Sequence, residues 1–203
     1  MTPYELYNKL ISEFSLRENI LCELHKPFIL KECRCSVALA KKMLNFDKIK
    51  DDYLRKTKQD SKSSVDGYTY KGNSHCFVEI KGWKKFLEYH TNDTTLEKDI
   101  EEQVKRFDLN KKLTDSMDIC GEITRDVCLF DSASVAFVLV TDIDTENDGI
   151  KNIFFDLESL AETSTKWDVI CNKELKNKLS VLPSSIRTYY TNCRNYDILI
   201  SKL

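Results

Sequence analysis

The sequence lacks the long apolar segment that a membrane-spanning helix needs. None of its hydrophobic runs approaches the roughly 20 residues that cross a bilayer. The N-terminus, Met1-Thr2-Pro3-Tyr4-Glu5, also lacks the basic stretch followed by an apolar stretch that marks a secretory signal. We therefore expect a cytoplasmic protein that has no membrane partner.

The eight cysteines lack the spacing of a metal site. Cys33 and Cys35 form the only close pair, and no Cys-x-x-Cys occurs. Structural zinc sites usually bring paired ligands about two to four residues apart. Disulfides are not expected without a secretory signal. We therefore predict that most of the cysteines are reduced and buried as small hydrophobic residues.

An excess of positive charge is also absent. The formal net charge is −2, from 31 basic and 33 acidic residues. A nucleic-acid partner would therefore bind a local basic patch, with metal ions offsetting the carboxylates at the site, because no globally basic surface is available.

The pattern of apolar residues predicts an α/β domain. Helices are expected over residues 4–24, 96–117 and 155–161. Strands are expected over residues 65–70, 75–81, 134–141, 167–171 and 196–202. The turn Lys71-Gly72-Asn73 joins the first two strands into a hairpin, and residues 56–64 read as a polar, mobile loop. With 203 residues, the chain fits a single domain that has a mixed central sheet flanked by helices.

Acidic-x-Lys triplets occur three times, and the setting of one of them suggests a site. About four such triplets are expected by chance from this composition. In Glu79-Ile80-Lys81 the outer two side chains share one face of a predicted strand, while Ile80 faces the core. Asp66, 13 positions before Glu79, stands at the start of the neighbouring strand. Hairpin pairing therefore predicts that the carboxyl groups of Asp66 and Glu79 lie close together.

Two clustered carboxylates repel each other unless a cation lies between them, and their hard oxygen ligands suit Mg²⁺ or Mn²⁺. Such an ion polarises a phosphoryl oxygen and lowers the pKa of a bound water. Lys81, beside the carboxylates, can stabilise the charge that builds up at phosphorus or orient the attacking water. The residue types and their order therefore fit phosphodiester hydrolysis.

Asp66 followed by Glu79-Ile80-Lys81 resembles the signature of the PD-(D/E)xK nuclease superfamily. The resemblance covers residues 60–142, with Val65 where the family often has Pro. It implies a restriction-endonuclease-like core within a single domain of residues 1–203, with N-terminal helical and C-terminal α/β additions. It also implies a metal bound by Asp66, Glu79 and the Ile80 carbonyl, a catalytic Lys81, and a DNA or RNA substrate.

In the RecB-like and lambda-exonuclease-like branch, which this chain resembles most, the following helix carries Gln-x-x-x-Tyr. The corresponding residues here are Gln103-Val104-Lys105-Arg106-Phe107, so that Phe replaces Tyr. Gln103 falls on the apolar stripe of the predicted helix and needs a buried partner or a site. The resemblance implies that Gln103 lies near the metal and the phosphate, and that Glu13 or Glu23 is a further acidic ligand.

The same residues have plainer interpretations. Asp66-Gly67 is a frequent hairpin-turn dipeptide, and Glu79 with Lys81 can form a weak pair on a solvated strand face. His75 reads equally well as a surface residue at a strand end or as a catalytic group. Two rival functions therefore stay open. One is an inactive nuclease-fold module that binds nucleic acid or protein, and the other is an interaction protein in which the motif is coincidental. A protein partner or a homodimer is compatible with each.

Overall fold

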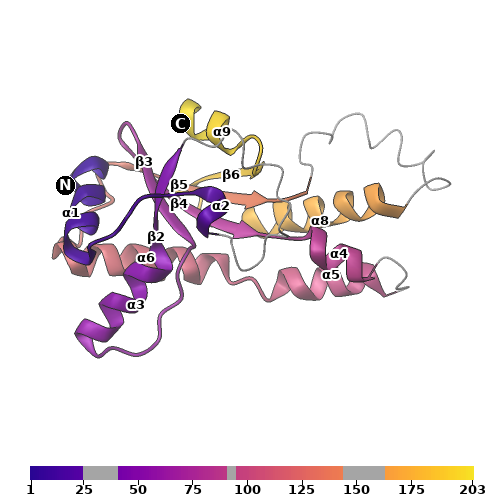
Figure 1. The fold of residues 1–203 in the computed structure, drawn as a ribbon, viewed down its shortest axis with the longest axis horizontal. Coiled ribbons are helices and arrows are strands. Elements are labelled where there is room, and N and C mark those ends of the chain that lie inside the picture. Colours follow the sequence, from indigo (N-terminus) through magenta and orange to yellow (C-terminus); the bar gives the residue numbers. More distant parts are fainter. Residues whose placement is uncertain (25–40, 91–94, 144–162) are drawn as a thin grey trace.

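The computed structural model describes residues 1–24, 41–90, 95–143 and 163–203. Within these ranges six strands form one mixed sheet in the order β1-β2-β3-β4-β5-β6 (Figure 1). Neighbouring strands from β1 to β4 are antiparallel, and β5 and β6 run parallel to β4. The strands are β1 (Asn19–Ile20), β2 (Lys42–Asn45), β3 (Gly67–Lys71), β4 (Ser74–Lys81), β5 (Ser134–Thr141) and β6 (Arg187–Asn192).

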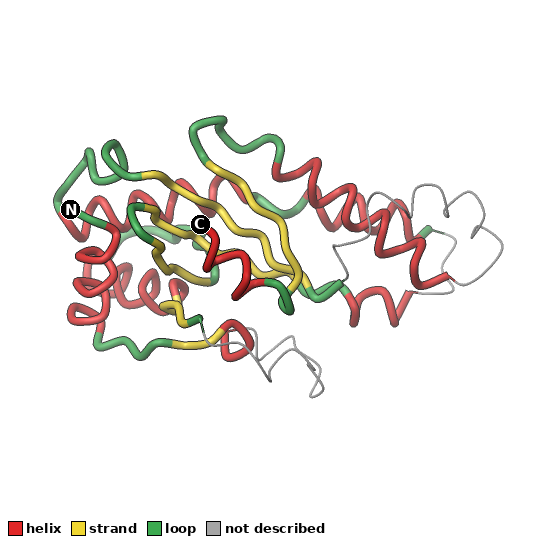
Figure 2. Tube along the Cα trace, turned by 90° about the horizontal axis from the view of Figure 1, so that it is seen from above, coloured by secondary structure: helices red, strands yellow, loops and turns green. Residues whose placement is uncertain are grey.

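The helices pack on both faces of this sheet. They are α1 (Pro3–Phe14), α2 (Leu21–Leu24), α3 (Phe46–Thr57), α4 (Lys84–His90), α5 (Leu96–Lys105), α6 (Leu109–Thr124), α8 (Thr163–Leu179) and α9 (Tyr196–Lys202). The larger hydrophobic cluster combines residues of α1, α3, α5, α6 and α8 with the sheet. The smaller cluster combines α2 and α9 with the other face, which α9 crosses in Figure 2. The expected α/β architecture with a mixed sheet flanked by helices is therefore confirmed.

The β3–β4 hairpin and strand β5 form where the sequence predicted them. The turn between β3 and β4 contains Gly72 with φ +54°, a left-handed conformation that glycine adopts without steric cost. Every residue of β4 except Lys81 is buried, because β3 and β5 lie on either side of it and helices cover both faces. Its side chains alternate, so Phe77 belongs to the larger cluster and Ile80 to the smaller. Glu79, two positions after Phe77, therefore faces α6.

Two predicted strands are helical in the structure. Residues 167–171 lie within α8, in which Cys171, Leu175 and Leu179 are buried at four-residue intervals. Residues 196–202 form α9, in which Tyr196 and Ile200 are buried in the same spacing. The β-branched and aromatic residues of both segments led to the prediction of strands. The buried residues recur at helical spacing, and the segments form helices. The last strand of the sheet is β6, which that reading missed.

The two long predicted helices are each interrupted. The helix expected over 4–24 ends at Phe14, because Ser15 adopts a left-handed conformation with φ 49° and caps it. The helix expected over 96–117 is two helices, α5 and α6, separated by residues 106–108. Asp108 accepts a hydrogen bond from the Lys111 N–H and so starts α6 as an N-cap. The helix expected over 155–161 lies outside the described residues.

The segment predicted to be a mobile loop is held against α6. The Glu122 carboxylate of α6 accepts hydrogen bonds from Gln59 at 3.0 Å and Lys62 at 2.7 Å, and from the Tyr53 hydroxyl of α3. The pairing with Lys62 and these hydrogen bonds lower the pKa of Glu122 to about 2. The polar composition of the segment thus reflects its contacts with a helix.

Four of the cysteines that the structure describes in detail are reduced and buried, namely Cys76, Cys120, Cys171 and Cys193, while Cys128 is exposed. None of the helices in the described ranges is long and apolar enough to cross a membrane.

His75 is buried in the core, so its interpretation as a surface residue was wrong. Its Nδ1 lies 2.7 Å from the Tyr68 hydroxyl, and its ring packs edge-on against Phe130 at 4.8 Å between centroids. Its Nε2 has no hydrogen-bond partner among the described residues. Burial lowers the pKa of His75 to about 4, so the folded protein keeps this imidazole neutral.

We predict that protonation of His75 destabilises the fold in mild acid. Its pKa is depressed in the folded state, so the unfolded chain binds the proton first as pH falls through about 6.5, and stability declines until pH reaches about 4. The loss is at most about 3 kcal/mol. Urea unfolding of the unaltered protein and of His75→Gln between pH 4 and 8 measures it. The difference between the two stability curves should be constant above pH 7 and change below it. Parallel curves over the whole range would contradict the assignment.

Candidate functional site

Asp66, Glu79 and Lys81 come together at one end of the sheet. Asp66 lies in the bend that leads into β3, and Glu79 and Lys81 are among the last three residues of β4. The hairpin register pairs Gly67 with Val78, which brings the residue before Gly67 beside the residues after Val78. The juxtaposition predicted from hairpin pairing is therefore present.

The Asp66 carboxylate extends the hydrogen bonding of β4 beyond its last pair with β3. Val78 is the last residue of β4 that pairs with β3, and Ile80 lies two residues further on. The Ile80 N–H donates a hydrogen bond to Asp66 Oδ2 at 2.6 Å, so a side chain takes the place of a backbone acceptor. Burial and, to a smaller extent, the charge of Glu79 raise the pKa of Asp66 to about 7, against the opposing effects of Lys81, the Ile80 N–H and Lys112.

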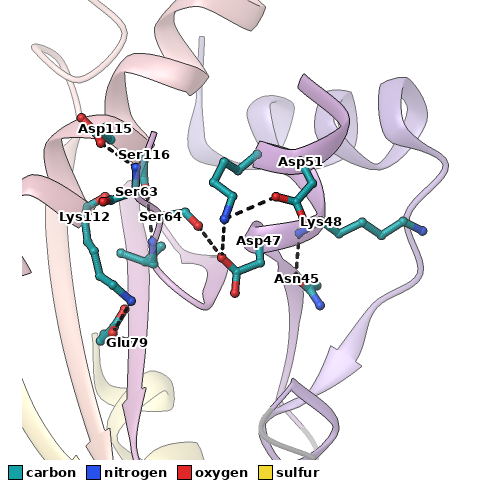
Figure 3. Close-up of polar contacts among 12 residues, drawn as sticks. Asn45, Asp47, Lys48, Asp51, Ser63, Ser64, Glu79, Lys112, Asp115 and Ser116 are labelled. Atoms are coloured by element: carbon teal, nitrogen blue, oxygen red, sulfur yellow. Dashed lines mark hydrogen bonds and ion pairs between the residues drawn. The ribbon is translucent and has the colours of Figure 1, made fainter. Parts of the chain in front are cut away.

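The Glu79 carboxylate is fully buried, with an exposed fraction of 0%. Its Oε1 lies 2.5 Å from Lys81 Nζ and 2.7 Å from Lys112 Nζ (Figure 3 shows the second contact). Its Oε2 is buried and accepts no hydrogen bond from the described residues. Two ammonium groups therefore share one oxygen of a carboxylate whose other oxygen is bare. The plainer interpretation of Glu79 as part of a solvated strand face was wrong.

Lys112, which sequence reasoning missed, reaches Glu79 from the first turn of α6. Burial lowers the pKa of Lys112, but the charge and hydrogen bond of Glu79, with smaller effects of Asp66 and Asp47, leave the pKa raised. A signal was available in the sequence. The buried residues of α6 include Leu109, Leu113 and Ser116, and Lys112 lies beside that stripe, where a lysine needs an anionic partner.

The same helix holds the segment that precedes Asp66. The Ser63 N–H donates to Asp115 Oδ2 at 2.7 Å, and the Val65 N–H donates to the buried Ser116 hydroxyl at 3.1 Å. The Ser64 hydroxyl donates to Asp47 of α3 at 2.5 Å (Figure 3). Successive residues before Asp66 are thus fixed by α6 and α3, and Lys112 and Asp66 are positioned by one rigid element.

Phe107 lies against Lys81. The Lys81 ammonium is 4.7 Å from the centroid of the Phe107 ring, which packs on Trp83 at 5.9 Å. Phe107 belongs to the Gln-x-x-x-Phe segment singled out above, so this part of the pattern does contact the site. Gln103 is half-buried on α5, and its amide makes no hydrogen bond within the described residues. Its role near a metal and a phosphate stays a prediction, as does that of the Ile80 carbonyl.

The predicted third acidic ligand is not found near the pair. Glu13 is exposed on α1, and Glu23 accepts a hydrogen bond from the Ile20 N–H at 3.1 Å. In the part of the chain that the structure describes, no group of three or more His, Cys, Asp or Glu residues is arranged to hold a metal ion.

A further carboxylate joins β5 to the helix after the motif. Asp142, the residue after β5, accepts hydrogen bonds from the Trp83 N–H at 2.7 Å and the Lys84 N–H at 3.3 Å. It therefore fixes the start of α4 beside Lys81. Trp83 is buried, so it is a core aromatic and offers no surface for base stacking.

Comparisons of the chain with protein-family models, with curated proteins and with solved structures gave no match.

We predict that Asp66→Asn stabilises the metal-free protein at alkaline pH. The pKa of Asp66 is raised in the folded state, so the contribution of Asp66 to stability is greatest below about pH 4 and falls as pH rises towards 7, by at most about 4 kcal/mol. An uncharged amide removes this penalty. Chemical unfolding in EDTA at pH 5 and pH 8.5 should show that the variant loses less stability between the two pH values than the unaltered protein. An equal loss in both would refute the assignment.

Proposed function

We propose that the protein is a divalent-metal-dependent nuclease that hydrolyses phosphodiester bonds of DNA or RNA. The observation that carries the proposal is the buried Glu79 Oε2, which accepts no hydrogen bond from the described residues, in a carboxylate that pairs with Lys81 through Oε1 and whose charge raises the pKa of Asp66. A buried carboxylate oxygen without a donor is costly, at roughly 1–3 kcal/mol or more for a charged group. A ligand that supplies positive charge at that oxygen would remove the cost.

The donor set fits Mg²⁺ or Mn²⁺. Glu79 Oε2 and the Asp66 carboxyl group would hold the ion, with the Ile80 carbonyl as the third protein ligand implied by the resemblance. Hard oxygen ligands suit these ions, which keep several waters and take further ligands from substrate phosphates. A bound ion would polarise a phosphoryl oxygen and lower the pKa of its water.

The residues of the chain itself have distinct roles in this proposal. Asp66, whose pKa is raised to about 7, can hold or release a proton at its carboxyl group near neutral pH. Lys81 would orient the attacking water or neutralise the charge that develops on the phosphate. Phe107 and Asp142 limit the freedom of Lys81 and of the segment after it.

The order of elements supports the resemblance. Strand β2 is followed by α3, by the antiparallel strands β3 and β4, by the helices α4, α5 and α6, and then by β5 parallel to β4. Asp66 directly precedes β3 and Glu79 lies on β4, an arrangement similar to the PD-(D/E)xK signature. We propose that this part of the chain is a restriction-endonuclease-like core.

An inactive module on the same fold is the second candidate. The observation that favours it is the pairing of both Lys81 and Lys112 with Glu79 Oε1, which neutralises the carboxylate without any metal. Metal binding separates the two candidates, since an inert module has no need of Mn²⁺.

The proposal predicts Mn²⁺ binding that depends on both carboxylates. Calorimetry should detect binding to the unaltered protein and none to the Asp66→Ala/Glu79→Ala double variant. Cleavage of single-stranded DNA, duplex DNA and RNA should require the metal, and Lys81→Met should lower the rate by about 100-fold or more.

Lys84→Met is the matched control for Lys81→Met, because Lys84 is exposed and only its backbone N–H is used nearby. It should cleave within about twofold of the unaltered protein, since an exposed lysine outside the cluster makes no contact to the reacting atoms. Metal-dependent cleavage that survives in Lys81→Met would sink the proposal. Absence of both metal binding and cleavage would favour the inactive module.

A further inference from the structure

The pairing of two lysines with one oxygen is more than a buried carboxylate needs. One ammonium is sufficient to neutralise Glu79, and Lys81 provides it from the same strand at 2.5 Å. Lys112 adds a second positive charge from α6 at 2.7 Å from the same oxygen. Two ammonium groups at such distances from one atom repel each other, and part of each is removed from water. Neutralisation of Glu79 alone therefore does not account for Lys112.

Both lysines have unused hydrogen-bond donors. An ammonium group has three N–H donors. Within the described residues, each of the two ammonium groups has Glu79 Oε1 as its sole hydrogen-bonding or ionic partner. The side chains of Lys81 and Lys112 are 20% and 27% exposed, so their remaining donors can reach a ligand that enters from solvent. A phosphate group in a phosphodiester offers two non-bridging oxygens to such donors.

We propose that Lys81 and Lys112 form a two-lysine binding site for the phosphate of a phosphodiester, with Lys112 as the second contact. The proposal deepens the proposed function and rests on it for the identity of the substrate. Glu79 Oε1 holds both ammonium groups and leaves Glu79 Oε2 for the metal, and each ammonium donates to one phosphate oxygen. The site therefore binds phosphate before and without the metal.

The rest of the cluster supports an anionic ligand. When Asp66 is ionised, two carboxylates balance two ammonium groups, and when it is protonated the cluster carries one net positive charge. Either state accepts an anion more readily than Glu79 and Asp66 alone would. The phosphate would bind the two lysines and the metal would bind the neighbouring carboxylates. Each ligand should therefore strengthen the binding of the other, by the same factor.

The test is binding of a single-stranded oligonucleotide of about ten nucleotides in EDTA, where no cleavage can occur. Fluorescence anisotropy of the labelled strand gives the affinity at several salt concentrations. Removal of one phosphate contact lowers the slope of log K against log salt by about 0.7 for a single strand. We expect this reduction for Lys112→Met, together with an affinity loss of about fivefold to tenfold at low salt, and a slope close to that of the unaltered protein for Lys112→Arg.

Lys111→Met is the control, because Lys111 is the neighbouring lysine on α6, is exposed, and removes the same charge. It should change the affinity by less than twofold. An unchanged slope in Lys112→Met, or an equal loss in Lys111→Met, would overturn the proposal, since the effect of Lys112 would then be absent or merely one of general charge.

A measurement on the unaltered protein covers the case in which Lys112→Met does not fold. Titration with dimethyl phosphate in EDTA should shift the NMR signals of the Lys81 and Lys112 ammonium groups and leave that of Lys111 in place. A Lys112 signal that does not move would overturn the proposal. This outcome does not depend on catalysis. Phosphate binding without cleavage would contradict the proposed nuclease activity and support the phosphate site of Lys81 and Lys112. Cleavage in which Lys112 has no role would support the nuclease activity and contradict that phosphate site.

Discussion

The arrangement at the end of the sheet follows from the burial of one carboxylate. Glu79 lies on the central strand with no exposed surface, and an isolated charge in that position would cost several kcal/mol. The fold meets this cost with Lys81 from the same strand and Lys112 from α6, while Asp66 shares the region and its pKa is raised in consequence. A strand that carried only apolar residues at this point would need none of these partners.

Helix α6 positions the residues around Glu79. Lys112 holds Glu79, and one turn later Asp115 and Ser116 hold the backbone that leads to Asp66. About two turns after Asp115, Glu122 holds the beginning of the same segment. A single face of one helix therefore sets the separation between the two carboxylates, although they belong to a different part of the chain. This is the arrangement expected where a site has to be held in one geometry by a rigid support.

The sequence was informative where a local rule decides the structure. The β3–β4 hairpin followed from a glycine turn between two β-rich segments, β5 from an unbroken apolar run, and the proximity of Asp66 and Glu79 from hairpin register. The prediction was wrong for α8 and α9, where amino-acid composition and the spacing of buried residues point to different structures. Their β-branched and aromatic residues favour strands, whereas their buried residues have helical spacing. The place of Lys112 beside an apolar stripe indicates that it needs an anionic partner, but nothing local identifies that partner as Glu79, 33 positions earlier. The break before Asp108 was also needed to place α6.

The hydrogen bond from the Ile80 N–H to Asp66 gives the protein an internal reporter. An amide in a regular ladder faces a carbonyl whose charge never changes, so its proton resonance reports only geometry. This amide instead faces a carboxyl group that gains or loses a full charge near neutrality and that lies beside the bare oxygen of Glu79. Its chemical shift and its exchange with solvent deuterium are therefore a direct record of what occupies the site, readable in the unmodified protein without any label on a ligand.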